Sequence, residues 1–103
     1  MASITRPKRE VPGLRDANVH RLERLAGELR RRGMAASLVS APGRIPRLEV
    51  ACPAGQAEDV YAWRGEDGSW WFWWSWAERI AGAADLDDAS AKIEQMLTRR
   101  SWG

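Results

Sequence analysis

Eight of the nine aromatic residues in this chain of 103 lie between Tyr61 and Trp76. The densest part, residues 69–76, reads Ser-Trp-Trp-Phe-Trp-Trp-Ser-Trp. Aromatic residues are enriched in strands, and successive side chains of a strand point to opposite faces. Burying one aromatic ring removes roughly 150–250 Å² from water. The fold must therefore bury one set of rings and place the other set on the opposite face of a sheet.

The aromatic run forms the second half of a predicted β-hairpin. Residues 59–64 and 69–76 are separated by Gly-Glu-Asp-Gly at residues 65–68, and glycines around a short acidic segment are typical of a tight hairpin loop. Two registers are open. A type I turn with a bulge at Gly68 gives one register and is favoured by the Glu-Asp-Gly sequence, whereas an even loop without a bulge gives the other.

Alternation divides the aromatic strand into two faces. One face carries four aromatic residues, Trp70, Phe72, Trp74 and Trp76. We expect this four-aromatic face to be buried beneath helices, which leaves Trp71 and Trp73 on the water-facing side. A strand pattern at residues 47–52 alternates apolar and polar residues, which predicts that one side of the sheet is open. Tyr61 and Trp63 join the open side in the bulged register and lie beside the buried rings in the other.

Helical periodicity predicts one helix near each end of the chain. A stripe of apolar residues indicates a first helix from Asp16, capped by Asp16 or Asn18 and stopped at Gly33. A last helix opens at Asp85, with further aspartates in its first turn. Residues 1–15 show no periodicity and contain prolines and basic residues, so we expect a flexible basic tail.

Two more strands complete the expected fold. Residues 34–40 and 47–52 have strand patterns, and residues 77–84 are expected to be irregular or partly helical. The element order is then α-β-β-β-β-α. Short connections predict a two-layer α+β sandwich, in which a four-stranded antiparallel meander carries both helices on one face. Residues 16–103 form a single domain of this kind.

Charge is distributed unevenly along the chain. Residues 1–50 carry eleven Lys/Arg and five Asp/Glu (+6), and residues 51–103 carry five and nine (−4). The polar side of the first helix is rich in arginine, and Glu28 is spaced to pair with Arg24, Arg31 and Arg32. A solvated, self-paired face is the expectation, and contact with an anion is the alternative. The candidate anion contacts are Arg21, Arg24, Arg31 and Arg32.

The sequence carries no pattern of groups that would indicate catalysis. His20 is the only histidine and lies on the charged side of the first helix, and Cys52 follows the apolar positions of a strand, which predicts a buried thiol. Phosphate loops, nucleophile elbows and metal-ligand spacings are missing. We therefore expect no enzyme, no cofactor, no metal and no small-molecule substrate. The chain has neither a signal-peptide pattern nor an apolar run that could span a membrane, so a cytoplasmic location is expected.

The tryptophan-rich strand, followed by Glu78-Arg79-Ile80 and an aspartate-capped helix, resembles small uncharacterised proteins of high-GC actinobacteria. The resemblance covers residues 59–98. It implies no activity, cofactor or partner.

Three interpretations of the open-face aromatics compete. In the first, these aromatic residues are covered within the monomer, by the tail or by Trp102. In the second, they mediate self-association or contact with a protein partner. In the third, they stack unpaired bases of a nucleic acid. We expect a non-enzymatic interaction module that forms a homodimer or binds a protein partner. The alternative is a single-stranded nucleic-acid binder that also uses the basic helix and tail. The binding residues expected in either case are Trp71, Trp73, Tyr61, Trp63 and Arg47.

Overall fold

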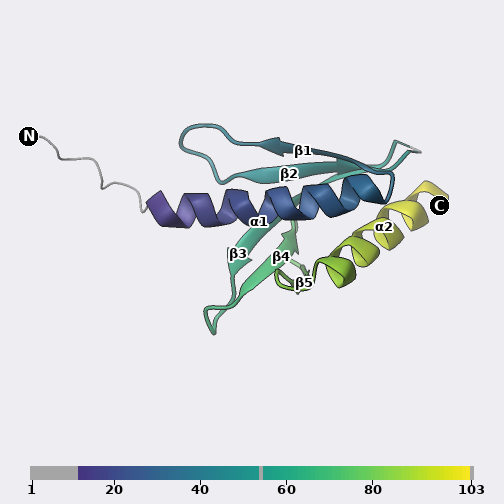
Figure 1. Ribbon diagram of the computed structural model, residues 1–103. Coiled ribbons are helices and arrows are strands. Elements are labelled where there is room, and N and C mark those ends of the chain that lie inside the picture. The colour runs from purple at the N-terminus through teal and green to yellow at the C-terminus, as the bar shows by residue number, and fades with distance from the viewer. Residues whose placement is uncertain (1–11, 54, 103) are drawn as a thin grey trace, which may run out of the picture.

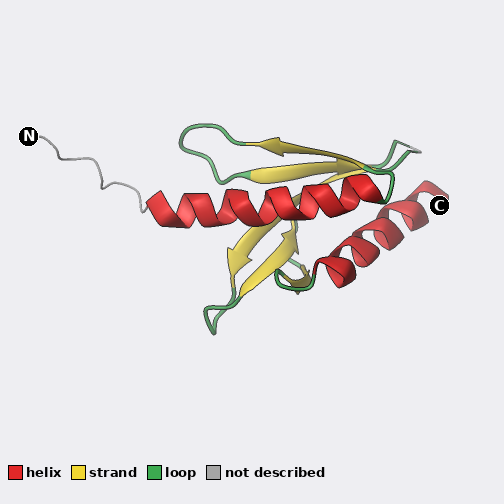
Figure 2. Cartoon of the chain, in the orientation of Figure 1, coloured by secondary structure: helices red, strands yellow, loops and turns green. Residues whose placement is uncertain are grey.

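The computed structural model describes residues 12–53 and 55–102, and the side chains of residues 17–53 and 55–99. Two helices and five strands are present (Figures 1 and 2). They are α1 (Pro12–Arg31), β1 (Ala35–Val39), β2 (Arg47–Ala51), β3 (Ala57–Arg64), β4 (Trp70–Trp74), β5 (Arg79–Gly82) and α2 (Leu86–Trp102). The strands form one antiparallel sheet in the order β1-β2-β3-β4-β5, so the predicted α+β class is confirmed.

The sheet has one strand more than predicted. The segment 77–84, expected to be irregular or partly helical, contains β5, in which Ala81 pairs with Phe72 of β4. The chain reverses at Ala77, which has a φ of 67°, and the Trp74 N–H donates to the Glu78 carbonyl at 2.8 Å. A four-residue strand is too short to show alternation in the sequence. Its formation depends on the free edge that β4 offers for pairing.

Helix α1 begins at Pro12, four residues before the predicted start at Asp16. Proline suits the first turn of a helix because its missing N–H would have no partner there. Asn18 therefore lies inside the helix instead of capping it; its side chain is 2% exposed, and its Oδ1 has no partner among the described residues. Residues 12–15 of the expected tail are helical, and residues 1–11 lie outside the described residues.

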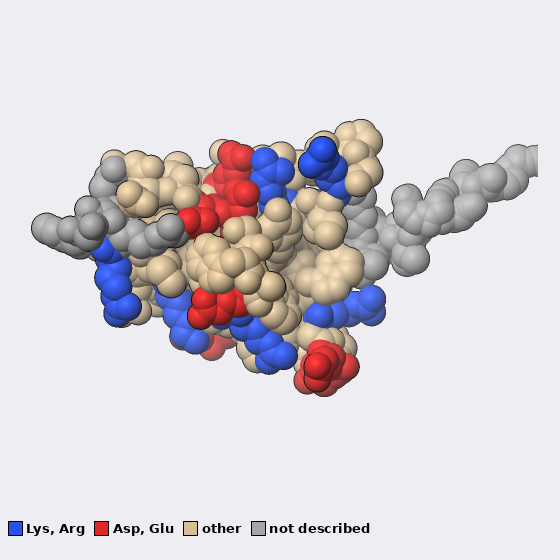
Figure 3. Space-filling view, turned by 180° about the vertical axis from the view of Figure 1, so that it is seen from behind, with Lys and Arg blue, Asp and Glu red and all other residues tan. Residues whose placement is uncertain are grey.

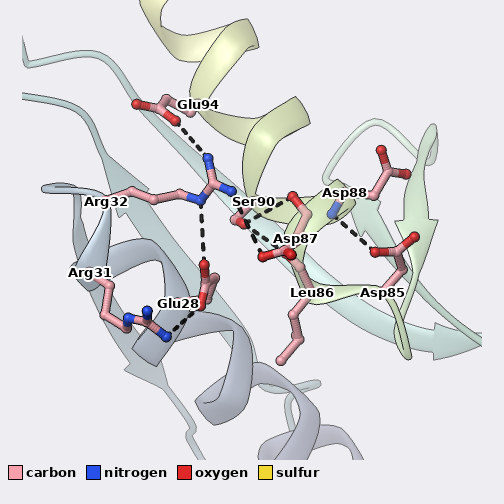
Figure 4. Close-up of polar contacts among 9 residues, drawn as sticks. All are labelled: Glu28, Arg31, Arg32, Asp85, Leu86, Asp87, Asp88, Ser90 and Glu94. Atoms are coloured by element: carbon pink, nitrogen blue, oxygen red, sulfur yellow. Dashed lines mark hydrogen bonds and ion pairs between the residues drawn. The ribbon is translucent and has the colours of Figure 1, made fainter.

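Helix α2 begins where its aspartate cap predicts. The Asp88 N–H donates to Asp85 Oδ1 at 3.2 Å, and the Ala89 N–H donates to the Asp85 carbonyl at 3.0 Å (Figure 4). The first bond satisfies a first-turn donor that has no partner within the helix, and the second is the first hydrogen bond of the helix itself.

A single buried cluster joins both helices to the sheet. Helix α1 contacts β1, β2 and β3, helix α2 contacts β5, and the helices contact each other; α1 crosses in front of the strands in Figure 1. The strands contribute alternate residues to the cluster, which include Leu48, Val50, Val60, Ala62, Phe72 and Trp74. Cys52 is also buried, as predicted, at 8% exposure. The intervening side chains therefore point away from the helices.

The predicted buried aromatic face is correct for three of its four members. Phe72 and Trp74 are buried, and Trp70 packs against the edge of the core. Trp76 is 45% exposed, because β4 ends at Trp74 and the turn that follows removes Trp76 from the strand alternation. Its ring stacks on that of Trp74 at 5.0 Å, and its Nε1 donates to Glu78 Oε1 at 2.7 Å.

The hairpin loop adopts the bulged form. Gly68 has a φ of 87°, and its N–H donates to the Gly65 carbonyl at 3.0 Å, while the Gly65 N–H donates to the Ser69 carbonyl at 2.7 Å. Tyr61 therefore pairs with Trp73 and Trp63 pairs with Trp71. All four aromatic residues share one face of the sheet.

Two glycine-to-alanine substitutions should have opposite effects on stability. Gly68→Ala places a Cβ on a left-handed residue and should lower the free energy of unfolding by about 1–2 kcal/mol. Gly27→Ala, on the exposed side of α1 with nothing within 4 Å of the added atom, should raise it by about 0.5–1 kcal/mol. Urea unfolding measures both changes; equal effects of the two variants would contradict this account of the turn.

Asp67 in this turn should make the free energy of unfolding depend on pH in the acidic range. Asp67 Oδ1 accepts the Ser69 N–H at 3.0 Å, and this backbone hydrogen bond lowers the pKa of Asp67 below its usual range. The carboxylate then stabilises the fold fully above its unfolded pKa of about 3.9, and this contribution is lost as the pH falls through the lowered folded pKa. Asp67→Asn should therefore be less stable than wild type at neutral pH, with a difference that shrinks in acid. Glu66→Gln is the control and should not remove this dependence.

Candidate binding face

The register of the hairpin groups four rings on the side of the sheet away from the helices. We call Tyr61, Trp63, Trp71 and Trp73 the aromatic face; they form two directly opposed cross-strand pairs of β3 and β4. Trp63 is 39% exposed, and the other three side chains are half-buried. Figure 3 views the molecule from behind, and it shows uncharged surface in the middle with acidic and basic groups around it. The residues predicted to form a binding face thus do lie together.

Trp71 is held between a glycine and an arginine. A Cβ added to Gly65 would lie 3.0 Å from Trp71 Nε1, so the absence of a side chain at Gly65 lets the indole lie close to the backbone. The guanidinium carbon of Arg79 lies 4.4 Å from the centre of the Trp71 ring and 5.4 Å from that of Trp73. Both distances are within the range of cation–π attraction. Arg79 therefore covers Trp71 and Trp73, which we call the inner half of the aromatic face; Tyr61 and Trp63 form its outer half.

Sequence reasoning missed Arg79 because it missed β5. The signal present in the sequence is the neighbouring apolar pair Ile80-Ala81, which fits a short buried strand. Its register places Arg79 opposite Trp73, but this pairing is a tertiary fact that the local pattern does not contain.

The Trp73 ring is also fixed by a hydrogen bond. Its Nε1 donates to the Trp63 carbonyl at 3.3 Å. Trp71 Nε1 is shielded from water and has no partner among the described residues. The inner half of the aromatic face is therefore held by interactions within the chain, which leaves the outer half for contact with another molecule.

The outer half contains a shallow hollow of about 410 Å³. Tyr61 and Trp63 line it together with Trp73 of the inner half, and Ile45, which is 54% exposed, lines it from the loop between β1 and β2. Its other lining residues are Arg64, Trp74, Ser75 and Ala77. Large exposed apolar groups beside an apolar hollow are typical of contact surfaces. Ile45 was not among the residues predicted from the sequence, because its loop gives no indication of where it lies relative to the hairpin.

Arg47 is engaged by neighbouring acids. It lies 3.0 Å from Glu49 and 3.4 Å from Asp59, measured from nitrogen to carboxylate oxygen, and the hydrogen bond to Glu49 raises the pKa of Arg47. These three side chains form a charged strip beside the aromatic face. Because Arg47 is already paired, it is a border residue of the face and not a free anion ligand.

Arg31 and Arg32, two of the predicted anion contacts, are paired with acids near the C-terminal end of α1 (Figure 4). Arg32 lies 3.1 Å from Glu94 and 3.6 Å from Glu28, and Arg31 lies 3.3 Å from Glu28. Two of the three predicted Glu28 pairs therefore form, and Arg32 joins α1 to α2. Arg32 therefore serves the packing of the two helices, whereas Arg31 pairs within α1.

Arg21 and Arg24 lie on the helix side of the sheet. The guanidinium carbon of Arg21 is 4.3 Å from the centre of the Trp70 ring. Trp70 precedes Trp71 on β4 and therefore points to the opposite side of the sheet. Of the aromatic face, Trp71 lines a hollow together with Arg21 and Arg24, whereas Tyr61, Trp63 and Trp73 line a different hollow.

The described residues contain no group of three His, Cys, Asp or Glu side chains that could hold a metal ion. His20 is exposed, as expected, and the Cys52 Sγ lies 3.9 Å from the Leu97 carbonyl oxygen. The proposed cover of the aromatic face by the tail or Trp102 falls on residues 1–11 and a C-terminal side chain, which lie outside the described part. Within that part, no helix has the length and apolar character needed to cross a membrane.

No protein-family model, curated protein or solved structure matches this chain. Statements about its function therefore depend on the geometry described above.

Removing the arginine that covers the inner rings should loosen them. Arg79→Ala should lower the free energy of unfolding by about 1 kcal/mol, because two indole rings lose a cation–π partner. It should also increase the quenching of tryptophan fluorescence by acrylamide. Arg99→Ala removes the same charge from the exposed side of α2 and should change neither measurement. An unchanged quenching profile in Arg79→Ala would show that Arg79 does not shield the rings.

Proposed function

We propose that this chain is a cytoplasmic, non-enzymatic interaction module that forms a homodimer through its aromatic face. The proposal treats it as a two-layer domain, with one side of the sheet under both helices and the other side free. The observation that carries the proposal is the position of Trp63, a 39% exposed ring that borders an apolar hollow of about 410 Å³.

A protruding ring beside a hollow suits a two-fold contact. In such a contact the same surface is used on both subunits, so Trp63 of each copy would enter the hollow of the other. Tryptophan is enriched among the residues that contribute most to protein interfaces. The adjoining charged strip is compatible with this packing, because Arg47 already pairs with Glu49 and Asp59. A second copy would therefore meet few unpaired charges there.

The alternative, single-stranded nucleic-acid binding, has less support at this face. Arg79 occupies the side of Trp71 and Trp73 on which a base would stack. The carboxylates of Glu49 and Asp59 border the face and would repel phosphates. The basic residues Arg21 and Arg24 line a hollow with Trp71 but not with Tyr61, Trp63 or Trp73, so they do not assist stacking at those three rings.

Light scattering after size exclusion, over a series of concentrations up to high micromolar, tests the dimer. Wild type should approach the mass of a dimer, and Trp63→Ala should remain a monomer. Trp76→Ala is the matched control, because it removes a tryptophan of similar exposure, 45%, that does not belong to the aromatic face. A wild-type monomer throughout the series, or equal loss of dimer in both variants, would refute the proposal. Fluorescence titration with a single-stranded oligonucleotide at low salt checks the alternative.

A further inference from the structure

A second hollow lies on the helix side of the sheet, where α1 passes the start of β4 and the end of β5. It encloses about 470 Å³. Its walls are formed by His20, Arg21 and Arg24 of α1, by Ser69, Trp70 and Trp71, and by the small residues 82–84. Residues three and four apart on a helix are neighbours on its surface, so α1 directs three basic or titratable side chains to one hollow.

Arg21 is a half-buried cation with no carboxylate partner among the described residues. Its guanidinium lies over the Trp70 ring at 4.3 Å, and its Nη1 donates one hydrogen bond, to the Ala17 carbonyl at 3.3 Å. A guanidinium has five N–H donors in a planar fork. Ion pairs within 4.0 Å among the described residues include neither Arg21 nor Arg24. Most of the donor capacity of both side chains is therefore unused.

The remaining arginines of α1 whose side chains are described have partners. Arg30 donates from Nε and Nη2 to the Ala36 carbonyl at 3.2 and 2.6 Å. Arg31 pairs with Glu28, and Arg32 pairs with Glu28 and Glu94. Unneutralised positive charge on this helix thus gathers at the second hollow, whereas the charge at its C-terminal end is used within the chain.

We propose that the second hollow binds a small phosphorylated ligand through its phosphate monoester group. Two arginines match the two negative charges of this group, and their planar forks can donate paired hydrogen bonds to its oxygens. The residues at positions 82–84 are glycine and alanine, which leaves room beside the phosphate for the rest of the ligand. The site shares Trp71 with the aromatic face. Trp63, the ring that carries the dimer proposal, lines the other hollow and not this one, so the two proposals depend on different residues.

Calorimetric titration at low ionic strength tests the site with four probes. They are inorganic phosphate, adenosine 5′-monophosphate, adenosine and acetate. The two phosphates should bind, adenosine should not, and acetate, with one charge, should bind at least tenfold more weakly than phosphate. A two-dimensional NMR spectrum recorded with each probe should show shifts of the Arg21 and Arg24 Nε–H signals and of Trp70 Nε1–H.

Variants assign the binding to the two arginines. Arg24 is exposed, so Arg24→Ala should fold normally, and it should weaken adenosine monophosphate binding about tenfold or more, because charge-assisted hydrogen bonds are lost. Arg21→Lys keeps the charge but not the fork and should also weaken binding. Arg99→Ala removes the same charge from α2 and should bind like wild type.

Three results would overturn the proposal. They are an absence of binding by either phosphate, equal weakening by Arg24→Ala and Arg99→Ala, and equal binding of adenosine and its monophosphate. The first would leave no anion site. The second would indicate a nonspecific effect of net charge, and the third would indicate recognition of the base.

Discussion

The left-handed conformation of Gly68 is the constraint on which the arrangement of the sheet depends. It allows Gly65 to pair with Ser69 across the turn, and this pairing sets the register of β3 against β4. Because side chains alternate along a strand, a shift of one residue would move Tyr61 and Trp63 to the helix side of the sheet. That side is already filled by Val60 and Ala62, which are fully buried. The turn and the core therefore require the same register.

Once this register is set, the aromatic face divides into a fixed and a free half. Trp71 lies against the bare backbone of Gly65 and under Arg79, and Trp73 is tied to the Trp63 carbonyl. The rings that remain accessible are Tyr61 and Trp63, which border the hollow of about 410 Å³. This division favours a partner that inserts a side chain over one that stacks on every ring.

The two hollows differ in chemistry because β4 alternates between two environments. Trp71 and Trp73 belong to a side bordered by paired charges, where Arg47 is neutralised by Glu49 and Asp59. Trp70 belongs to the side where α1 supplies unpaired arginines. One strand thus contributes to an apolar surface and to a basic hollow, and Trp71 belongs to both. The two proposals can be tested separately, because one depends on Trp63 and the other on Arg21 and Arg24.

The sequence by itself determined the hairpin, the aspartate cap of α2, the burial of Phe72 and the open side of the sheet. Each follows from a local rule, such as strand alternation, a glycine at positive φ or a side-chain oxygen at a helix start. Tertiary structure alone decided the pairing of β5, the position of Arg79 over two rings, the exposure of Trp76 and the division of the arginines into paired and unpaired sets. These features depend on which groups meet across the fold, and the turn at Ala77, which places β5 beside β4, leaves no mark in residue type or spacing. The aromatic face was therefore predictable from the sequence, whereas the cover over its inner half was not.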